Sequence, residues 1–226
     1  MPEGVFITND YLLDVARGNV PGQEIIHKFG AGSVGTSLVP ITQSGVYNTP
    51  TAVVSLEVVS DDVNDTSAGT GAQEVTLTII NASWERVDIV VELNGTTPVA
   101  LGTDTFRLDR WSVTRSGTYA TSAAGSHTGS LTVQVAGAGA VWSTIPSTPF
   151  PMAQSQIGAF TVPAGKKAYL VGKLVFTDTS KTADIYMFKR ENADDVATPF
   201  SGIMKITERE VGVSGGFDHH FKVPKF

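Results

Sequence analysis

Apolar residues alternate with polar ones along much of the chain beyond Thr51. The period of two is clear over residues 75–79 and returns over residues 87–93. Because neighbouring side chains of a strand point to opposite faces, this pattern predicts strands with one buried side and one solvent-facing side. Further runs follow, with turn residues between nearly all of them, as is typical of an antiparallel β-sandwich or jelly roll. We therefore predict a mainly β fold, built either as one sandwich or as two packed β subdomains.

A single short helix is predicted near the amino terminus. Its apolar stripe consists of Tyr11, Leu12, Val15 and Ala16. Thr8 or Asn9 can cap its first turn, and Gly18 can end it in a left-handed conformation. A helix of about ten residues is marginal in water unless it packs on something. It either packs on its own domain or belongs to a docking arm over residues 1–30 that a neighbouring subunit orders. In the second case the candidate assembly contacts are Tyr11, Leu12, Val15, Arg17, Ile26 and Phe29.

Turn-rich segments divide the chain into three regions. A Gly- and Ser-rich stretch ends near residue 45 and predicts a linker or long loop, so residues 1–45 form an arm that carries the helix. Residues 46–145 hold a first β-sandwich region. Prolines between Ile145 and Pro151 then interrupt the strand pattern and suit a crossover or a short link. Residues 146–226 form a second β region, which is either separate or part of the same sandwich.

Two local features of the strands can be predicted from particular residues. Asn94-Gly95 is the pair that best tolerates the positive φ angles of a type I′ turn, and residues 96–101 can return as the second strand of a hairpin. In the next apolar run the phase of the alternation flips, and a period of two cannot flip without an extra residue. A β-bulge near Asp109 or Arg110 accounts for this flip.

Two motifs that would indicate a bound cofactor or metal are incomplete. Gly30-x-Gly32-x-x-Gly35 has the spacing of a dinucleotide-binding loop, but the residues after it have no helical period and offer no helix terminus for a pyrophosphate. The acidic residues 61–65 could offer oxygen ligands to calcium, yet they lack the glycine and the closing glutamate of a calcium-binding loop. We interpret the first motif as a flexible loop and the second as a solvated turn.

The histidines form no predicted metal or catalytic site. His219 and His220 are adjacent in a predicted strand, so their rings point to opposite faces and cannot chelate one ion unless the backbone bends. His27 and His127 have no nucleophile or carboxylate arrangement nearby in the sequence, although a triad assembled from distant segments stays open. We therefore predict a protein that is not an enzyme, with no catalytic residue, no metal ligand and no cofactor.

Composition narrows the classes of partner. The formal net charge is −6, and the basic residues are scattered instead of forming a stripe that could replace counterions on phosphate, so nucleic acid is not an expected partner. No apolar run is long enough to cross a bilayer, and the first residues lack the features of a secretory signal, so we expect a soluble protein without a membrane partner. The absence of cysteine fits synthesis in the cytoplasm.

Several segments resemble a poorly characterised group of tailed-bacteriophage virion proteins found in aquatic phages. These segments are Val15 to Gly22, Ile26 to Gly30, Ala68 to Leu77, Trp84 to Val91, Leu93 to Val99 and Phe160 to Leu170. The resemblance covers most of the chain in the expected order and implies a structural role in the virion, with no catalytic residue carried over. Members of the group close with one more β segment after the region around Phe226, so the resemblance leaves the completeness of the second sheet open.

The resemblance and the all-β pattern together give three hypotheses for function. The first is a capsid-exterior decoration or cement protein that stabilises the assembled particle. The second is a tail or fibre component that contacts the host surface, and the third is a carbohydrate-active β-sandwich protein. Under the first two, the protein is located in a virion assembled in the host cytoplasm. Its partners are then other virion proteins of the capsid shell or tail and further copies of the chain, with a trimer as one alternative.

Overall fold

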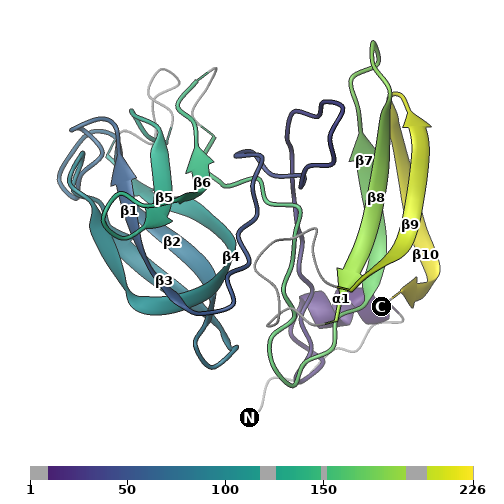
Figure 1. Cartoon of the computed structure of the whole chain (residues 1–226). Helices are drawn as coiled ribbons and strands as arrows, with labels where there is room; N and C mark the ends of the chain where they lie inside the picture. The colour runs from purple at the N-terminus through teal and green to yellow at the C-terminus, as the bar shows by residue number, and fades with distance from the viewer. Residues whose placement is uncertain (1–9, 118–125, 149–151, 192–202, 226) are drawn as a thin grey trace.

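The computed structural model describes residues 10–117, 126–148, 152–191 and 203–225, and beyond residue 216 it describes only the side chain of Asp218. The predicted fold class is confirmed: 45% of the chain is strand and 3% is helix, in a β-sandwich-like arrangement. Figure 1 shows two β lobes with extended segments of the chain between them. No helix in the described ranges is both long enough and apolar enough to cross a lipid bilayer.

The first lobe is one curled, antiparallel six-stranded sheet with the order β3-β2-β4-β1-β5-β6. Its strands are β1 (Val54–Ser60), β2 (Ala72–Asn81), β3 (Arg86–Glu92), β4 (Val99–Ser116), β5 (Leu131–Val135) and β6 (Val141–Ile145). The long strand β4 pairs with β1 through its first part and with β2 through the rest. Through this double pairing, β4 joins β2 and β1 into one sheet.

The main hydrophobic core lies within this first lobe. Leu56, Leu77 and Trp111 are each at most 1% exposed, and they come from β1, β2 and β4. The indole Nε1 of Trp111 donates a 2.9 Å hydrogen bond to Oγ of Ser143 in β6, so the largest core side chain also has its polar atom satisfied. The alternation of the sequence therefore marks a real buried face.

The predicted β-bulge in β4 is confirmed. Thr78 of β2 pairs with Arg110, and the next residue, Ile79, pairs with Leu108, so Asp109 is the extra residue. The bulge leaves Leu108 and Asp109 both buried although they are adjacent in a strand. It thereby places a carboxylate inside the protein.

The predicted hairpin at Asn94-Gly95 is wrong. Gly95 does have a positive φ of 59°, but β3 and β4 are not hydrogen-bonded neighbours because β2 lies between them. Val99 and Ala100, which were expected to return along β3, pair with β1 instead. Asn94 has no positive φ, so the turn is not of type I′ either. The pairing of β2 with β4 places the chain beside β1 after this turn.

The predicted helix is present as α1 (Tyr11–Ala16), and Gly18 follows it with a φ of 75°. The N-cap is Asp10, whose carboxylate accepts a 3.1 Å hydrogen bond from the amide of Leu13. The caps expected from the sequence, Thr8 and Asn9, lie outside the described residues. The helix is one turn shorter than predicted.

The second lobe consists of two two-stranded antiparallel sheets, β10-β7 and β8-β9. Its strands are β7 (Leu170–Phe176), β8 (Ala183–Arg190), β9 (Met204–Val213) and β10 (Gly216–Lys225). Lys173 of β7 forms ion pairs of 2.8 Å with Glu208 and 3.1 Å with Glu210, both in β9. These contacts join the two sheets face to face, and Figure 1 shows the four strands stacked closely.

Two segments without regular structure connect the lobes, and they run side by side (Figure 1). The amide of Gly158 donates a 2.8 Å hydrogen bond to the carbonyl of Ile41, and the amide of Gln43 donates a 2.9 Å bond to the carbonyl of Gln156. A Cβ atom at Gly30 would lie only 2.4 Å from the amide nitrogen of Gly158. Gly30, the first glycine of the apparent dinucleotide motif, is thus needed because two backbone segments cross closely there. No helix follows the motif.

Candidate functional site

The amino-terminal arm, residues 10–45 in the described part, meets the first lobe at the bulge in β4. The carboxylate of Asp109 is 1% exposed there. Its Oδ1 accepts a 3.4 Å hydrogen bond from the amide of Thr161, and its Oδ2 lies 3.8 Å from Nε of Arg86, too far for a hydrogen bond. Burial raises the pKa of Asp109, against the opposing effect of Lys28 and Arg86. The bulge therefore holds a buried carboxylate that is only partly compensated.

Lys28 of the arm inserts its ammonium at the same place. Its Nζ donates a hydrogen bond to the main-chain carbonyl of Asp109. Burial lowers the pKa of Lys28 to about 8, the carboxylate of Asp109 opposes this shift, and the charges of Arg110 and Arg86 add to it. Three cationic side chains thus surround one buried carboxylate.

A second charge of the arm also anchors it to the first lobe. Glu24 lies 3.2 Å from Arg86, which belongs to β3. Glu24 and Lys28 are four residues apart, so in an extended chain they lie on the same side. The alternate side chains Ile25, at 46% exposed, and Phe29, at 50%, remain at the surface. The arm is therefore held by its charged face and leaves its apolar face uncovered.

A groove of about 230 Å³ opens beside this anchor, between the arm, β4 and the segment that follows residue 152. Its lining residues are His27, Lys28, Phe29, Arg110, Trp111, Ser112, Gln154, Ser155 and Ile157. The floor is fixed by the amide of Trp111, which donates a 2.9 Å hydrogen bond to Oγ of Ser155. The lining contains basic and neutral side chains and no carboxylate.

The second lobe exposes large apolar side chains. Leu174 and Phe176 of β7 are 60% and 74% exposed, and Ile206 and Val211 of β9 are 63% and 62% exposed. No apolar side chain described in residues 170–225 is fully buried. Two-stranded sheets are rarely stable without further strands or a packed face. Leu174 and Phe176 lie on the face of β7 opposite Lys173, and Ile206 and Val211 lie on the face of β9 opposite Glu208 and Glu210. These four side chains define the apolar surface of the lobe, which is divided between its two outer faces.

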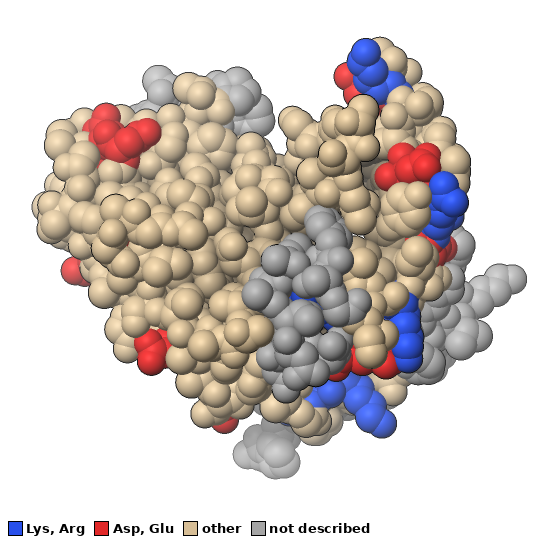
Figure 2. All heavy atoms as spheres, viewed as in Figure 1, with Lys and Arg blue, Asp and Glu red and all other residues tan. Residues whose placement is uncertain are grey.

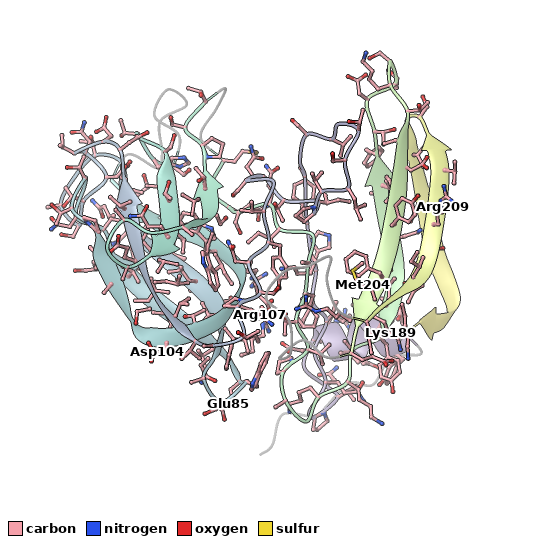
Figure 3. The ribbon with its side chains drawn as sticks, in the orientation of Figure 1. Glu85, Asp104, Arg107, Lys189, Met204 and Arg209 are labelled. Carbon is pink, nitrogen blue, oxygen red and sulfur yellow. The ribbon has the colours of Figure 1, made fainter. Side chains whose placement is uncertain are left out.

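Charged groups hold the second lobe together where an apolar core would be expected. Besides the ion pairs of Lys173, Arg209 lies 3.2 Å from Asp184, and its Cζ is 5.1 Å from the centre of the Tyr186 ring. Figure 3 marks Arg209 on this lobe, with Lys189 nearer the end close to the helix. Figure 2 shows both blue and red groups on the second lobe, whereas the charged groups that stand out on the visible face of the first lobe are red.

The six candidate assembly residues are placed differently from one another. Tyr11 and Leu12 are exposed on α1, and Arg17 at its C-cap is exposed as well. Val15 is 5% exposed and packs inward. The remaining two, in the arm, are a half-buried Ile26 and the exposed Phe29 described above. Their contact with another protein stays a prediction.

The acidic stretch 61–65 was predicted to be a solvated turn, and this is wrong for its last residue. Asp65 is 0% exposed, and its carboxylate accepts four hydrogen bonds of 2.6 to 2.8 Å. The donors are the hydroxyl of Ser60 and the amides of Ala72, Thr128 and Gly129. The carboxylate therefore ties the β1–β2 loop to the loop before β5, and its four acceptor positions are used.

His127 is also a structural residue. It is 2% exposed, with Nδ1 2.7 Å from Oγ of Ser126 and Nε2 3.2 Å from the carbonyl of Pro146. Burial lowers its pKa. The side chains of His219 and His220 lie outside the described residues. Within the ranges that the structure describes, no three His, Asp or Glu side chains gather in a way that could hold a metal ion.

Sequence reasoning missed the groove because its residues come from three distant parts of the chain. The phase flip in β4 did indicate that Asp109 or Arg110 occupies an unusual position. Nothing in the sequence indicated that Lys28 of the arm and Gln154 of the link would lie beside it. Comparison with known proteins adds no further assignment: no family model matches the chain, and no curated protein or solved structure matches it.

Proposed function

We propose that this chain is a non-catalytic structural protein of a tailed-phage particle, bound to the outside of the capsid as a decoration or cement protein. The observation that carries the proposal is the second lobe, where Leu174, Phe176, Ile206 and Val211 are each at least 60% exposed, two on each outer face. Exposed apolar side chains that gather on one face of a sheet often mark a surface that binds another protein. A lobe of this kind is completed by contacts with other subunits.

The amino-terminal arm supports the same proposal. Its charged face is anchored on Arg86 and Asp109, while Tyr11 and Phe29 are at least half exposed. An extended segment that presents apolar side chains outward is suited to bind a neighbouring molecule. The phage setting itself rests on the resemblance of the sequence segments described above, and the partners are then other virion proteins and further copies of this chain.

A cement protein stabilises the capsid by binding and needs no catalytic activity. A protein that binds only the assembled lattice stabilises that lattice by mass action, and neither a cofactor nor a nucleic acid takes part. The groove beside Lys28 has no pair of carboxylates, which a glycoside hydrolase of the common type requires. We therefore favour binding over catalysis for this surface.

A tail or fibre position is the second candidate, and the basic groove is the observation that favours it. A receptor-contacting protein needs a site for a molecule of the host surface, whereas a cement protein does not. The two positions differ in where the protein lies on the particle and in what its removal does.

Labelling of purified particles tests the proposal. An antibody raised against the chain should label the capsid surface of the phage that encodes it, and particles lacking the protein should lose DNA on mild heating. Label over the tail would replace the proposal with the second candidate. Particles without label would contradict both.

A matched pair of variants connects this test to the apolar surface. Leu174→Ser together with Phe176→Ser should abolish binding of the purified chain to particles that lack it. Val90→Ser, in β3 of the first lobe, removes an apolar side chain that is also 60% exposed and should leave binding unchanged. Equal binding by both variants would show that the second lobe is not the contact surface.

A further inference from the structure

The groove between the arm and β4 combines positive charge with unused hydrogen-bonding groups. Arg110 is exposed, and within the described residues it forms no hydrogen bond or ion pair closer than 4 Å. The nearby carboxylate of Asp109 is directed to Arg86 and Thr161 instead. His27 and the buried ammonium of Lys28 line the same groove. In a chain with a net charge of −6, this is a local site that attracts an anion.

Arg110 is placed to bind a planar anionic group. A guanidinium presents its N–H donors in a fixed fork that matches the two oxygens of a carboxylate, and such paired hydrogen bonds are among the strongest in proteins. The bulge at Asp109 fixes the direction of this side chain, because it returns Arg110 and Ser112 to the outer face of β4 while Trp111 points into the core. The fork is therefore carried by a rigid strand.

Neutral polar groups lie beside the charged ones. Ser112 forms a β-bridge with Gln154, so both residues are held at the same edge of the groove. Within the part of the chain that the structure describes, neither side chain makes a hydrogen bond to another protein group. A serine hydroxyl and a glutamine amide can each donate and accept, as the hydroxyl groups of a sugar require.

The size and the remaining wall of the groove indicate a ligand larger than a simple ion. Its volume of about 230 Å³ lies just below the 300 to 1,000 Å³ range typical of drug-sized ligands, which suits a single sugar ring. Phe29 contributes a half-exposed aromatic ring that can cover the apolar face of such a ring. A bare inorganic anion would gain nothing from this ring.

We propose that this groove binds an acidic sugar, with its carboxylate on Arg110 and its hydroxyl groups on Ser112 and Gln154. This inference goes beyond the structural role proposed above, since a decoration protein can fulfil that role with the groove empty. An acidic polysaccharide and a free uronic acid share the same chemistry. They differ in whether neighbouring sugar units add affinity.

Calorimetric titration of the full chain tests the site. Trigalacturonate should bind, galactotriose, the trimer of the corresponding neutral sugar, should not, and sodium sulfate should bind at least about tenfold more weakly. Maltotriose, a second neutral trisaccharide, should not bind either. Stronger binding of trigalacturonate than of galacturonic acid would identify a polysaccharide as the source, and equal binding would identify the free sugar. Equal affinity for sulfate, or for maltotriose, would overturn the assignment of an acidic sugar.

A matched substitution locates the binding. Arg110→Gln should weaken trigalacturonate binding about ten- to a hundredfold, the range of a charge-assisted hydrogen bond. Arg115→Gln removes the same charge from the same strand, but Arg115 pairs with Glu92 and does not line the groove. It should leave the affinity unchanged. Equal losses in the two variants would mean that the ligand is attracted by general charge, and the proposed site would be wrong.

Discussion

The side chain of Lys28 is buried in an environment that favours the neutral amine over the ammonium ion. Its pKa in the folded protein is about 8, below the ordinary value of 10.5, because burial outweighs the attraction of Asp109. Between these two values the unfolded chain holds more protons than the folded one, so stability rises with pH across that window. The charges of Arg86 and Arg110, which also face Lys28, add to this lowering. The contribution of Lys28 to the free energy of unfolding therefore becomes more favourable as the pH rises from about 8 toward 10.5.

We expect Lys28→Met to remove this dependence. From pH 7 to pH 9.5, the free energy of unfolding of the wild type should rise by about 2 kcal/mol relative to the variant. Urea unfolding at several pH values measures the difference, with the exposed Lys205→Met as control. The range stops below pH 10 because Tyr47, whose pKa burial raises to about 12, acts in the opposite direction above it. Parallel pH curves for wild type and Lys28→Met would contradict the prediction.

At the scale of elements, local patterns predicted local geometry and failed on pairing. The bulge could be located within one residue, because an extra residue in a strand necessarily shifts the alternation at that point. The hairpin at Asn94-Gly95 could not be decided in the same way. A turn sequence only favours certain backbone angles, and here Gly95 alone has the positive φ that the pair was expected to share. The partner of the following strand depends on β1, which is some forty residues away in the chain. Sequence alternation carries no information about that choice.

The Asp65 carboxylate connects loops that follow different strands, and its partners define what a substitution would do. All four partners donate hydrogen bonds to it. In Asp65→Asn, one oxygen becomes an amide group that also donates, so at least one pair of donors is left facing another donor. We expect a loss of about 3 to 5 kcal/mol in the free energy of unfolding, since bonds to a charged group contribute about 1.5 to 3 kcal/mol each.

Asp104→Asn is the control for this loss. Asp104 is exposed and accepts one hydrogen bond, from the hydroxyl of Ser55, which an amide oxygen can also accept. Its effect should stay within about 0.5 kcal/mol. Chemical denaturation of both variants gives the comparison, and a similar small effect at Asp65 would show that the two loops do not depend on its carboxylate.

For the whole molecule, the sequence predicted a mainly β chain but did not predict that, among the residues the structure describes, only the first lobe has a buried apolar core. Both lobes have alternating strands, and alternation reports which face of a strand is apolar without reporting what covers that face. In the first lobe the apolar faces of six strands close on one another around Trp111. In the second lobe only two pairs of strands meet, and Lys173 with its carboxylate partners occupies the space between them. The same pattern therefore gives a core in one case and an exposed surface in the other.

This difference predicts a gradient of local stability. Segments with few buried apolar contacts open more easily than a packed core, and hydrogen exchange of backbone amides reports the opening. In the isolated chain, peptides from β7 and β9 should exchange on the order of tenfold faster or more than peptides from β2 and β4. Mass spectrometry of exchanged and digested protein measures both sets in one experiment, so the first lobe serves as the internal control.

Assembly should reverse the gradient in the second lobe alone. When the chain is bound to particles, contacts with neighbouring subunits cover Leu174 and Phe176, and opening of β7 then requires breaking those contacts first. Exchange in β7 and β9 should slow toward the rate of the first lobe, whereas exchange in β2 stays as it was. Slow exchange of the second lobe already in the isolated chain would mean that its ion pairs stabilise it without a partner. The apolar surface would then lose its role as the reason for assembly.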